Sequence, residues 1–107
     1  MTVYNKLVRD NIPQIIEATG KKFTTRILND QEFIKHLKQK CYEELDEYCA
    51  ANTNEEAVEE LADLMEIIRS LAKYHGLSME EIEKIRQGKA VKRGEFEEKV
   101  FLVEVEE

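Results

Sequence analysis

Two long stretches of the chain carry apolar residues at a helical spacing, and helix-capping residues bound both stretches. The first is predicted to run from about position 30 to 51. The second begins at the capping box Thr53-x-x-Glu56 and is predicted to end near His75, where Gly76 follows. Because the connection between them is short, the two helices are expected to pack antiparallel.

Shorter elements flank this predicted hairpin. Pro13 suits the first turn of a short helix from Asn11 to Ala18, which Asp10 or Asn11 would cap and Gly20 would end. After the hairpin, the capping box Ser78-x-x-Glu81 predicts a helix that reaches residue 87 or a little beyond.

Two segments near the ends of the chain have the composition of strands. Lys22–Leu28 and Val100–Val105 are rich in β-branched and apolar residues, and an isolated strand leaves its backbone groups unsatisfied, so the two could pair. The predicted fold class is therefore all-α, a helical bundle with at most a short terminal β-strand pair. With 107 residues and no linker-like segment, residues 1–107 are expected to form a single domain.

Acidic residues on the first long helix point in two directions. At about 100° per residue, Glu44 and Glu47 lie on the flank of the apolar stripe, whereas Glu43 and Asp46 lie on the opposite face. The residues of that stripe are Ile34, Leu37, Cys41, Leu45 and Tyr48. Glu44 and Glu47 are therefore expected to face the edge of the core.

The second long helix repeats this arrangement. Glu60 lies inside its apolar stripe, Asp63 lies at the edge of the stripe, and Glu59 points away. Residues three apart on a helix are neighbours, so Glu60 and Asp63 form a second inward acidic pair.

Antiparallel packing would bring the two acidic pairs face to face. Carboxylates held close together favour a compensating cation, and an all-oxygen ligand set favours Mg²⁺, with Mn²⁺ as an alternative. Glu44, Glu47, Glu60 and Asp63 are thus the candidate metal ligands and catalytic residues. The alternative is a bundle in which acids at the core edge pair with nearby cations, namely Lys38, Lys40 and Arg69.

The overall charge narrows the partners that the chain is expected to bind. A formal net charge of -7 argues against a nucleic-acid-binding surface, which needs clustered Lys and Arg. It permits a nucleotide, because a bound cation recruits phosphates. No apolar run is long enough to span a membrane and the N-terminus lacks an apolar signal region, so a cytoplasmic location is expected.

The acidic pairs and both ends of the chain resemble one known family. Glu44-Leu-Asp-Glu47 and Glu60-Leu-Ala-Asp63 resemble the acidic motif of the all-α nucleoside triphosphate pyrophosphohydrolase superfamily, the MazG-like group. The opening stretch 4–13 and the closing stretch 92–96 resemble the terminal motifs of a subgroup of small MazG-like proteins.

The resemblance implies a fold and a reaction. The fold is a helical bundle, expected as a homodimer or homotetramer. The reaction is Mg²⁺-dependent cleavage of a nucleoside triphosphate between its α- and β-phosphates, which yields a monophosphate and pyrophosphate. The four acids would hold the metal, and one of them or Glu56 would take the proton of the attacking water.

Basic residues at both ends suit a phosphate substrate. Lys6 and Arg9 near the N-terminus, and Lys92 and Arg93 near the C-terminus, are candidate substrate-binding residues because cations bind phosphate oxygens. Two alternatives stay open at this point. One is phosphoribosyl-ATP pyrophosphohydrolase, from the same superfamily, and the other is a non-catalytic helical oligomerisation or regulatory module.

Overall fold

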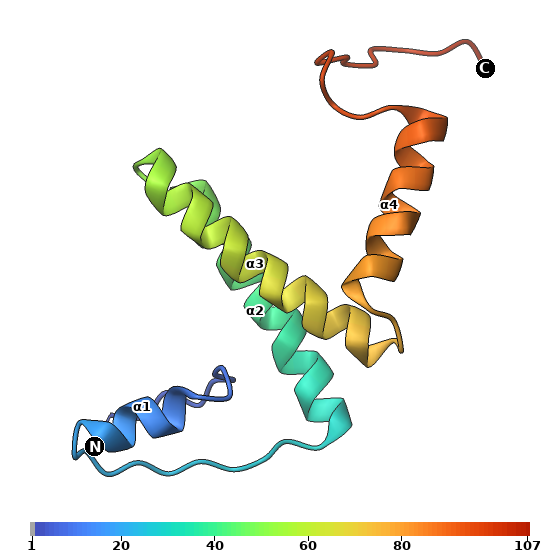
Figure 1. The fold of residues 1–107 in the computed structure, drawn as a ribbon. Coiled ribbons are helices and arrows are strands. Elements are labelled where there is room, and N and C mark those ends of the chain that lie inside the picture. Colours follow the sequence, from blue (N-terminus) through green and yellow to red (C-terminus); the bar gives the residue numbers. More distant parts are fainter. Residues whose placement is uncertain (1) are drawn as a thin grey trace.

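The computed structural model describes residues 2–107 and contains four helices within them (Figure 1). The helices are α1 (Ile12–Ala18), α2 (Asp30–Ala50), α3 (Asn54–Tyr74) and α4 (Met79–Arg93). No strand occurs among the described residues. The predicted all-α fold class is thus confirmed.

The starts of α2 and α4 follow from hydrogen bonds within one turn. At the start of α2, the Glu32 N–H donates to the Asn29 side chain at 2.9 Å, and the Asn29 N–H donates to the Glu32 carboxylate at 3.4 Å. Ser78 and Glu81 make the same reciprocal pair at the start of α4, so the capping box predicted there is confirmed.

The start of α3 differs from the prediction in one bond. The Glu56 N–H donates to the Thr53 hydroxyl at 3.1 Å, as a capping box requires. The Glu56 carboxylate, however, accepts from the Asn52 N–H at 3.0 Å instead of the Thr53 N–H. The reciprocal bond of the predicted capping box is therefore wrong, because Glu56 accepts from the N–H of Asn52, the residue before Thr53.

Two helix boundaries also differ from the sequence expectation. Asn11 occupies the cap position of α1, but its side chain makes no capping hydrogen bond. Helix α4 continues to Arg93, past the expected end near Gln87. Gly88 lowers helix propensity without ending the helix, and the chain turns only at Gly94, whose φ of 80° is left-handed.

Helices α2 and α3 pack against each other as the predicted antiparallel hairpin (Figure 1). Three apolar side chains are buried among the described residues, namely Leu37, Ile67 and Ala72. Helix α4 contacts α3 and leads away from the hairpin, while α1 lies to one side. The radius of gyration is 18.4 Å, against about 13 Å for a compact domain of this length.

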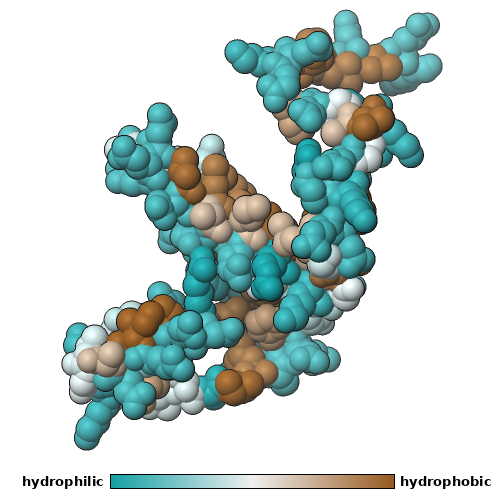
Figure 2. Space-filling view, viewed as in Figure 1, coloured by the Kyte–Doolittle hydropathy of each residue, from teal (hydrophilic) through white to brown (hydrophobic). Residues whose placement is uncertain are grey.

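This open arrangement leaves apolar side chains at the surface, as the brown patches in Figure 2 show. On α3, Val58 is 63% exposed and Met65 is 60% exposed. An apolar face of α3 is therefore wider than its packed neighbours α2 and α4 cover.

The strand pair that the sequence allowed does not form within the described chain. Lys22–Leu28 links α1 to α2, whereas Val100–Val105 follows α4 on the other side of the molecule (Figure 1). The hairpin separates the two segments, so neither can reach the other. Among the described residues, no helix combines the length and apolarity that a membrane span requires.

Candidate metal centre

Three carboxylates converge where α2 and α3 cross. Glu44 and Glu47 stand one turn apart on α2, and Glu60 approaches them from α3. One oxygen from each of the three lies within 4.8 Å of the others. The sequence-adjacent acids Glu43 and Glu59 are exposed, whereas Glu44 and Glu60 are half-buried, as the helical periodicity predicts.

Two oxygens of this cluster are shielded from water and have no donor. Glu44 Oε2 and Glu60 Oε2 are buried, and neither accepts a hydrogen bond from any described group. A carboxylate oxygen removed from water without a partner is unfavourable. A hard divalent cation would supply the missing charge, and oxygen-only ligands suit Mg²⁺ or Mn²⁺. The cluster therefore fits a metal site of the predicted kind.

Crowding of the three acids changes how they hold protons. The pKa of Glu60 is raised to about 7, first by the close approach of the Glu44 side chain, then by that of Glu47, and further by burial. Burial raises the pKa of Glu44, and the negative charges of Glu47 and Asp63 add to the effect. The crowding of these carboxylates thus favours the protonated form of Glu60 and Glu44 over the charged form.

The fourth predicted ligand, Asp63, has a different partner. Its Oδ1 accepts a hydrogen bond from Arg9 Nη2 at 2.8 Å. It lies outside the group of three converging oxygens, but its charge still acts on Glu44. The structure thus brings together three of the four predicted acids and places a predicted phosphate-binding arginine beside the fourth.

The other residues predicted to bind substrate or accept a proton are not part of the group of three converging acids. The Lys6 ammonium sits over the Tyr4 ring, 5.5 Å from the ring centre. Lys92 and Arg93 occupy the last turn of α4, away from the α2–α3 crossing (Figure 1). Glu56, a candidate proton acceptor, has its carboxylate at the start of α3, where it binds the Asn52 N–H.

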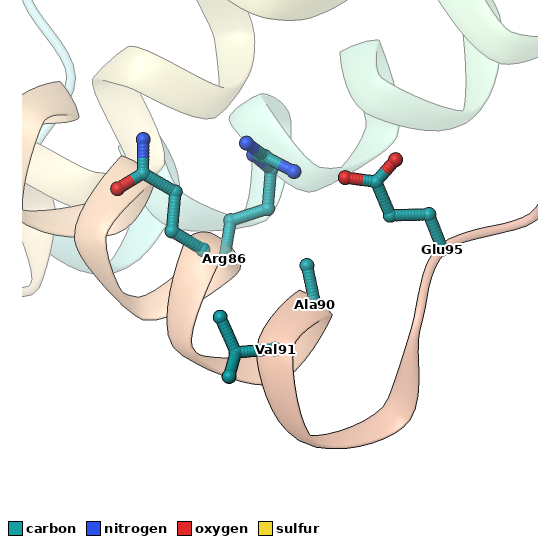
Figure 3. Close-up of a pocket in the computed structure, with 5 residues that line it drawn as sticks. Arg86, Ala90, Val91 and Glu95 are labelled. Atoms are coloured by element: carbon teal, nitrogen blue, oxygen red, sulfur yellow. The ribbon is translucent and has the colours of Figure 1, made fainter.

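A groove of about 400 Å³ lies along the second half of α4 (Figure 3). Arg86 and Glu95 reach toward it from the helix and from the chain after it, and its floor includes Ala90 and Val91. The Arg86 guanidinium donates hydrogen bonds to the Glu83 carboxylate at 2.6 to 3.0 Å. Among the described residues, the acids that converge closely enough to hold a metal ion are Glu44, Glu47 and Glu60, and none of them lines this groove.

The pairing of Arg9 with Asp63 was not predicted from the sequence. Both residues were singled out, but for separate roles. Their opposite charges were the available signal, although helical periodicity cannot relate the segment before α1 to a residue on α3. Only the folded chain shows that Arg9 lies at the edge of the acidic cluster.

Comparisons with known proteins show the family of this chain. The sequence model of the phosphoribosyl-ATP pyrophosphohydrolase family matches residues 6–89. An uncharacterized protein of Mycolicibacterium smegmatis (strain ATCC 700084 / mc(2)155) is 43% identical over 54 residues, which are 50% of this chain and 55% of that protein. The chain thus spans about half the length of this relative. No solved structure matches.

Because the family match covers most of the chain, including all three converging acids, the chain belongs to the phosphoribosyl-ATP pyrophosphohydrolase family, within the MazG-like all-α pyrophosphohydrolase superfamily.

Proposed function

We propose that this protein is a divalent-cation-dependent nucleotide pyrophosphohydrolase. It would cleave a nucleoside triphosphate between the α- and β-phosphates and release a monophosphate and pyrophosphate. The observation that carries this proposal is the convergence of Glu44, Glu47 and Glu60, with two shielded oxygens that lack a donor. Family membership supports the same class of reaction, hydrolysis of a phosphoric anhydride.

The three converging acids are the residues that would hold Mg²⁺, with Asp63 next to them. When bound, the cation polarises the phosphoryl group and makes a nearby water more acidic. Glu44 and Glu60 offer the shielded oxygens. Glu47 is the exposed member of the three, so water reaches its carboxylate most readily, and we assign it as the acceptor of the proton of the attacking water.

Arg9 would bind the phosphates. In the structure its guanidinium is held next to the cluster by Asp63, and both side chains are more than 40% exposed. An exposed ion pair is weak and can be exchanged for another partner. A polyphosphate at the cluster would draw the guanidinium into charge-assisted hydrogen bonds, which favour the departing pyrophosphate.

A second candidate substrate is phosphoribosyl-ATP. The match of the family model over residues 6–89 favours it. The terminal motifs favour the nucleoside triphosphate, because they resemble those of small MazG-like proteins. Both substrates contain the same α–β anhydride, so the cluster would act on either in the same way.

A substrate panel tests this proposal. The purified protein is incubated with each canonical nucleoside and deoxynucleoside triphosphate and with phosphoribosyl-ATP, with Mg²⁺ or with a chelator. We expect pyrophosphate, not orthophosphate, from at least one substrate in Mg²⁺ alone. Glu44→Gln serves as the control for contaminating enzymes. Binding of Mg²⁺ and nucleotide without turnover of any substrate would instead identify a non-catalytic module and refute the proposal.

A further inference from the structure

Two extended segments of the chain have strand-like composition and no strand partner. The linker segment, residues 21–28, joins α1 to α2, and the tail segment, residues 99–107, follows α4. Within the described chain, residues 21–28 and 100–107 make no backbone–backbone hydrogen bond. Most of their apolar side chains are exposed, with Ile27 96% exposed and Phe101 86% exposed, whereas Phe23 is 36% exposed. Backbone of this kind is a template for pairing with another chain.

The two segments cannot pair with each other in one molecule. They lie on opposite sides of the α2–α3 hairpin (Figure 1), and the molecule extends over 62 Å. Arg26 Nη2 donates a hydrogen bond to Glu32 Oε2 at 2.9 Å, so the end of the linker segment lies beside the start of α2. A tail segment that reaches the linker segment must therefore come from a second molecule.

The charges of the two segments are complementary. The linker segment carries Lys21, Lys22 and Arg26 and no acid. The tail segment ends in Glu104, Glu106 and Glu107. An antiparallel arrangement puts the lysines at the acidic end of the tail, whereas a parallel one would put them next to Lys99. Like charges opposite each other destabilise a strand pair, so the antiparallel direction is favoured.

One antiparallel register satisfies both faces of such a pair. It places Phe23, Thr25 and Ile27 opposite Val105, Val103 and Phe101, so one face is almost entirely apolar. On the other face it places Lys22 opposite Glu106. Directly opposite residues share a face and interact most strongly, and neighbours along each strand point the other way.

We infer that the linker segment of one molecule pairs antiparallel with the tail segment of a second copy of the same chain, with Thr25 opposite Val103. Each copy carries both segments, so two copies related by a two-fold axis make this contact twice and leave no linker or tail segment of the pair unpaired. Pairing also covers Ile27 and Phe101, which are solvent-exposed in one chain. The inference does not depend on the proposed catalytic function.

Disulfide trapping tests both the partner and the register. The native thiols are removed by Cys41→Ala and Cys49→Ala, because both cysteines are free. In this background, a chain with Thr25→Cys and a chain with Val103→Cys are co-expressed with different affinity tags. Directly opposite residues of an antiparallel pair lie within disulfide range. The matched control replaces Val103→Cys by Leu102→Cys, whose side chain points to the other face.

We expect a mild oxidant to join the two differently tagged chains through positions 25 and 103, at least tenfold more than through positions 25 and 102. No such cross-link, or equal cross-linking with the Leu102→Cys chain, would overturn the inference. Amide hydrogen exchange on the unaltered protein provides a second measurement that needs no variant. Slow exchange within residues 23–27 and 101–105 supports the pairing, and exchange at the rate of an unstructured peptide refutes it.

Discussion

Arg9 Nη2 donates a hydrogen bond to Asp63 Oδ1 at 2.8 Å, although 54 positions separate the two residues in the sequence. This bond holds the segment before α1 beside the acidic edge of α3. Both side chains are largely exposed, so the pair contributes only about 0.2–1 kcal/mol to stability. A bond of this strength positions the guanidinium without locking it, which suits a residue that exchanges a carboxylate for a phosphate.

Arg9→Ala should therefore raise KM for the nucleotide by about tenfold or more, since a hydrogen bond to a charged group is worth about 1.5–3 kcal/mol. Its melting temperature without substrate should change little. Steady-state kinetics and thermal unfolding measure the two effects. Arg69→Ala is the matched control, because Arg69 is equally exposed and pairs with Glu66 on α3. Equal changes of KM in both variants would contradict the role of Arg9.

Glu44→Gln should lower Mg²⁺-dependent activity by about 100-fold or more, as losses of electrostatic stabilisers do. Glu43→Gln should leave it nearly unchanged, because Glu43 is exposed and points away from the cluster. The pair Glu60→Gln and Glu59→Gln should behave in the same way. Pyrophosphate release by folded proteins measures this contrast. If Glu43→Gln and Glu44→Gln lost equal activity, the assignment of the cluster as the metal site would be wrong.

The metal-free protein should lose stability as pH rises from about 4.5 to 7. The pKa of Glu60 is about 7 in the folded chain, against an ordinary value of 4.5. Over that interval the folded state binds more protons than the unfolded state, so the free energy of unfolding falls with pH, and the loss is complete above pH 7. Urea unfolding in the presence of a chelator measures it.

Glu60→Gln is the control for this pH dependence. The substitution removes the titrating group, so the stability of the variant should fall less between pH 4.5 and 7 than that of the original protein. At pH 8 without metal, the variant should be the more stable of the two, because it lacks one of the crowded charges. A variant with the same pH profile as the original protein would show that Glu60 does not titrate in this range.

Mg²⁺ should raise the melting temperature of the original protein. A ligand that binds only the folded state stabilises it by about 2.7 kcal/mol at 100 times its dissociation constant. Glu60→Gln should reduce this gain, and Glu59→Gln should retain it. Differential scanning calorimetry over a Mg²⁺ series gives the comparison. A metal-dependent shift of the same size in both variants would place the bound cation elsewhere.

Local features of the fold could be predicted from the sequence alone. The capping pair at Ser78 involves atoms three residues apart, so the residue types and their spacing are enough to predict it. The outward orientation of Glu43 and the inward orientation of Glu44 follow likewise from the 3.6-residue period. Helix α4 continues past the predicted end near Gln87 to Arg93, because Gly88 weakens helix propensity without breaking the helix, and it ends at the left-handed Gly94.

Only the tertiary structure decided which of these residues meet. The approach of Glu60 to Glu44 depends on how α2 and α3 cross, and the absence of donors at their Oε2 atoms depends on everything packed around them. The same holds for Asp63, which binds Arg9, and for Arg93, which α4 carries away from the cluster. The sequence alone determined the elements and the faces of the helices, because these follow from interactions within a few residues. The partners of each side chain were decided by packing between segments distant in sequence, which no local pattern encodes.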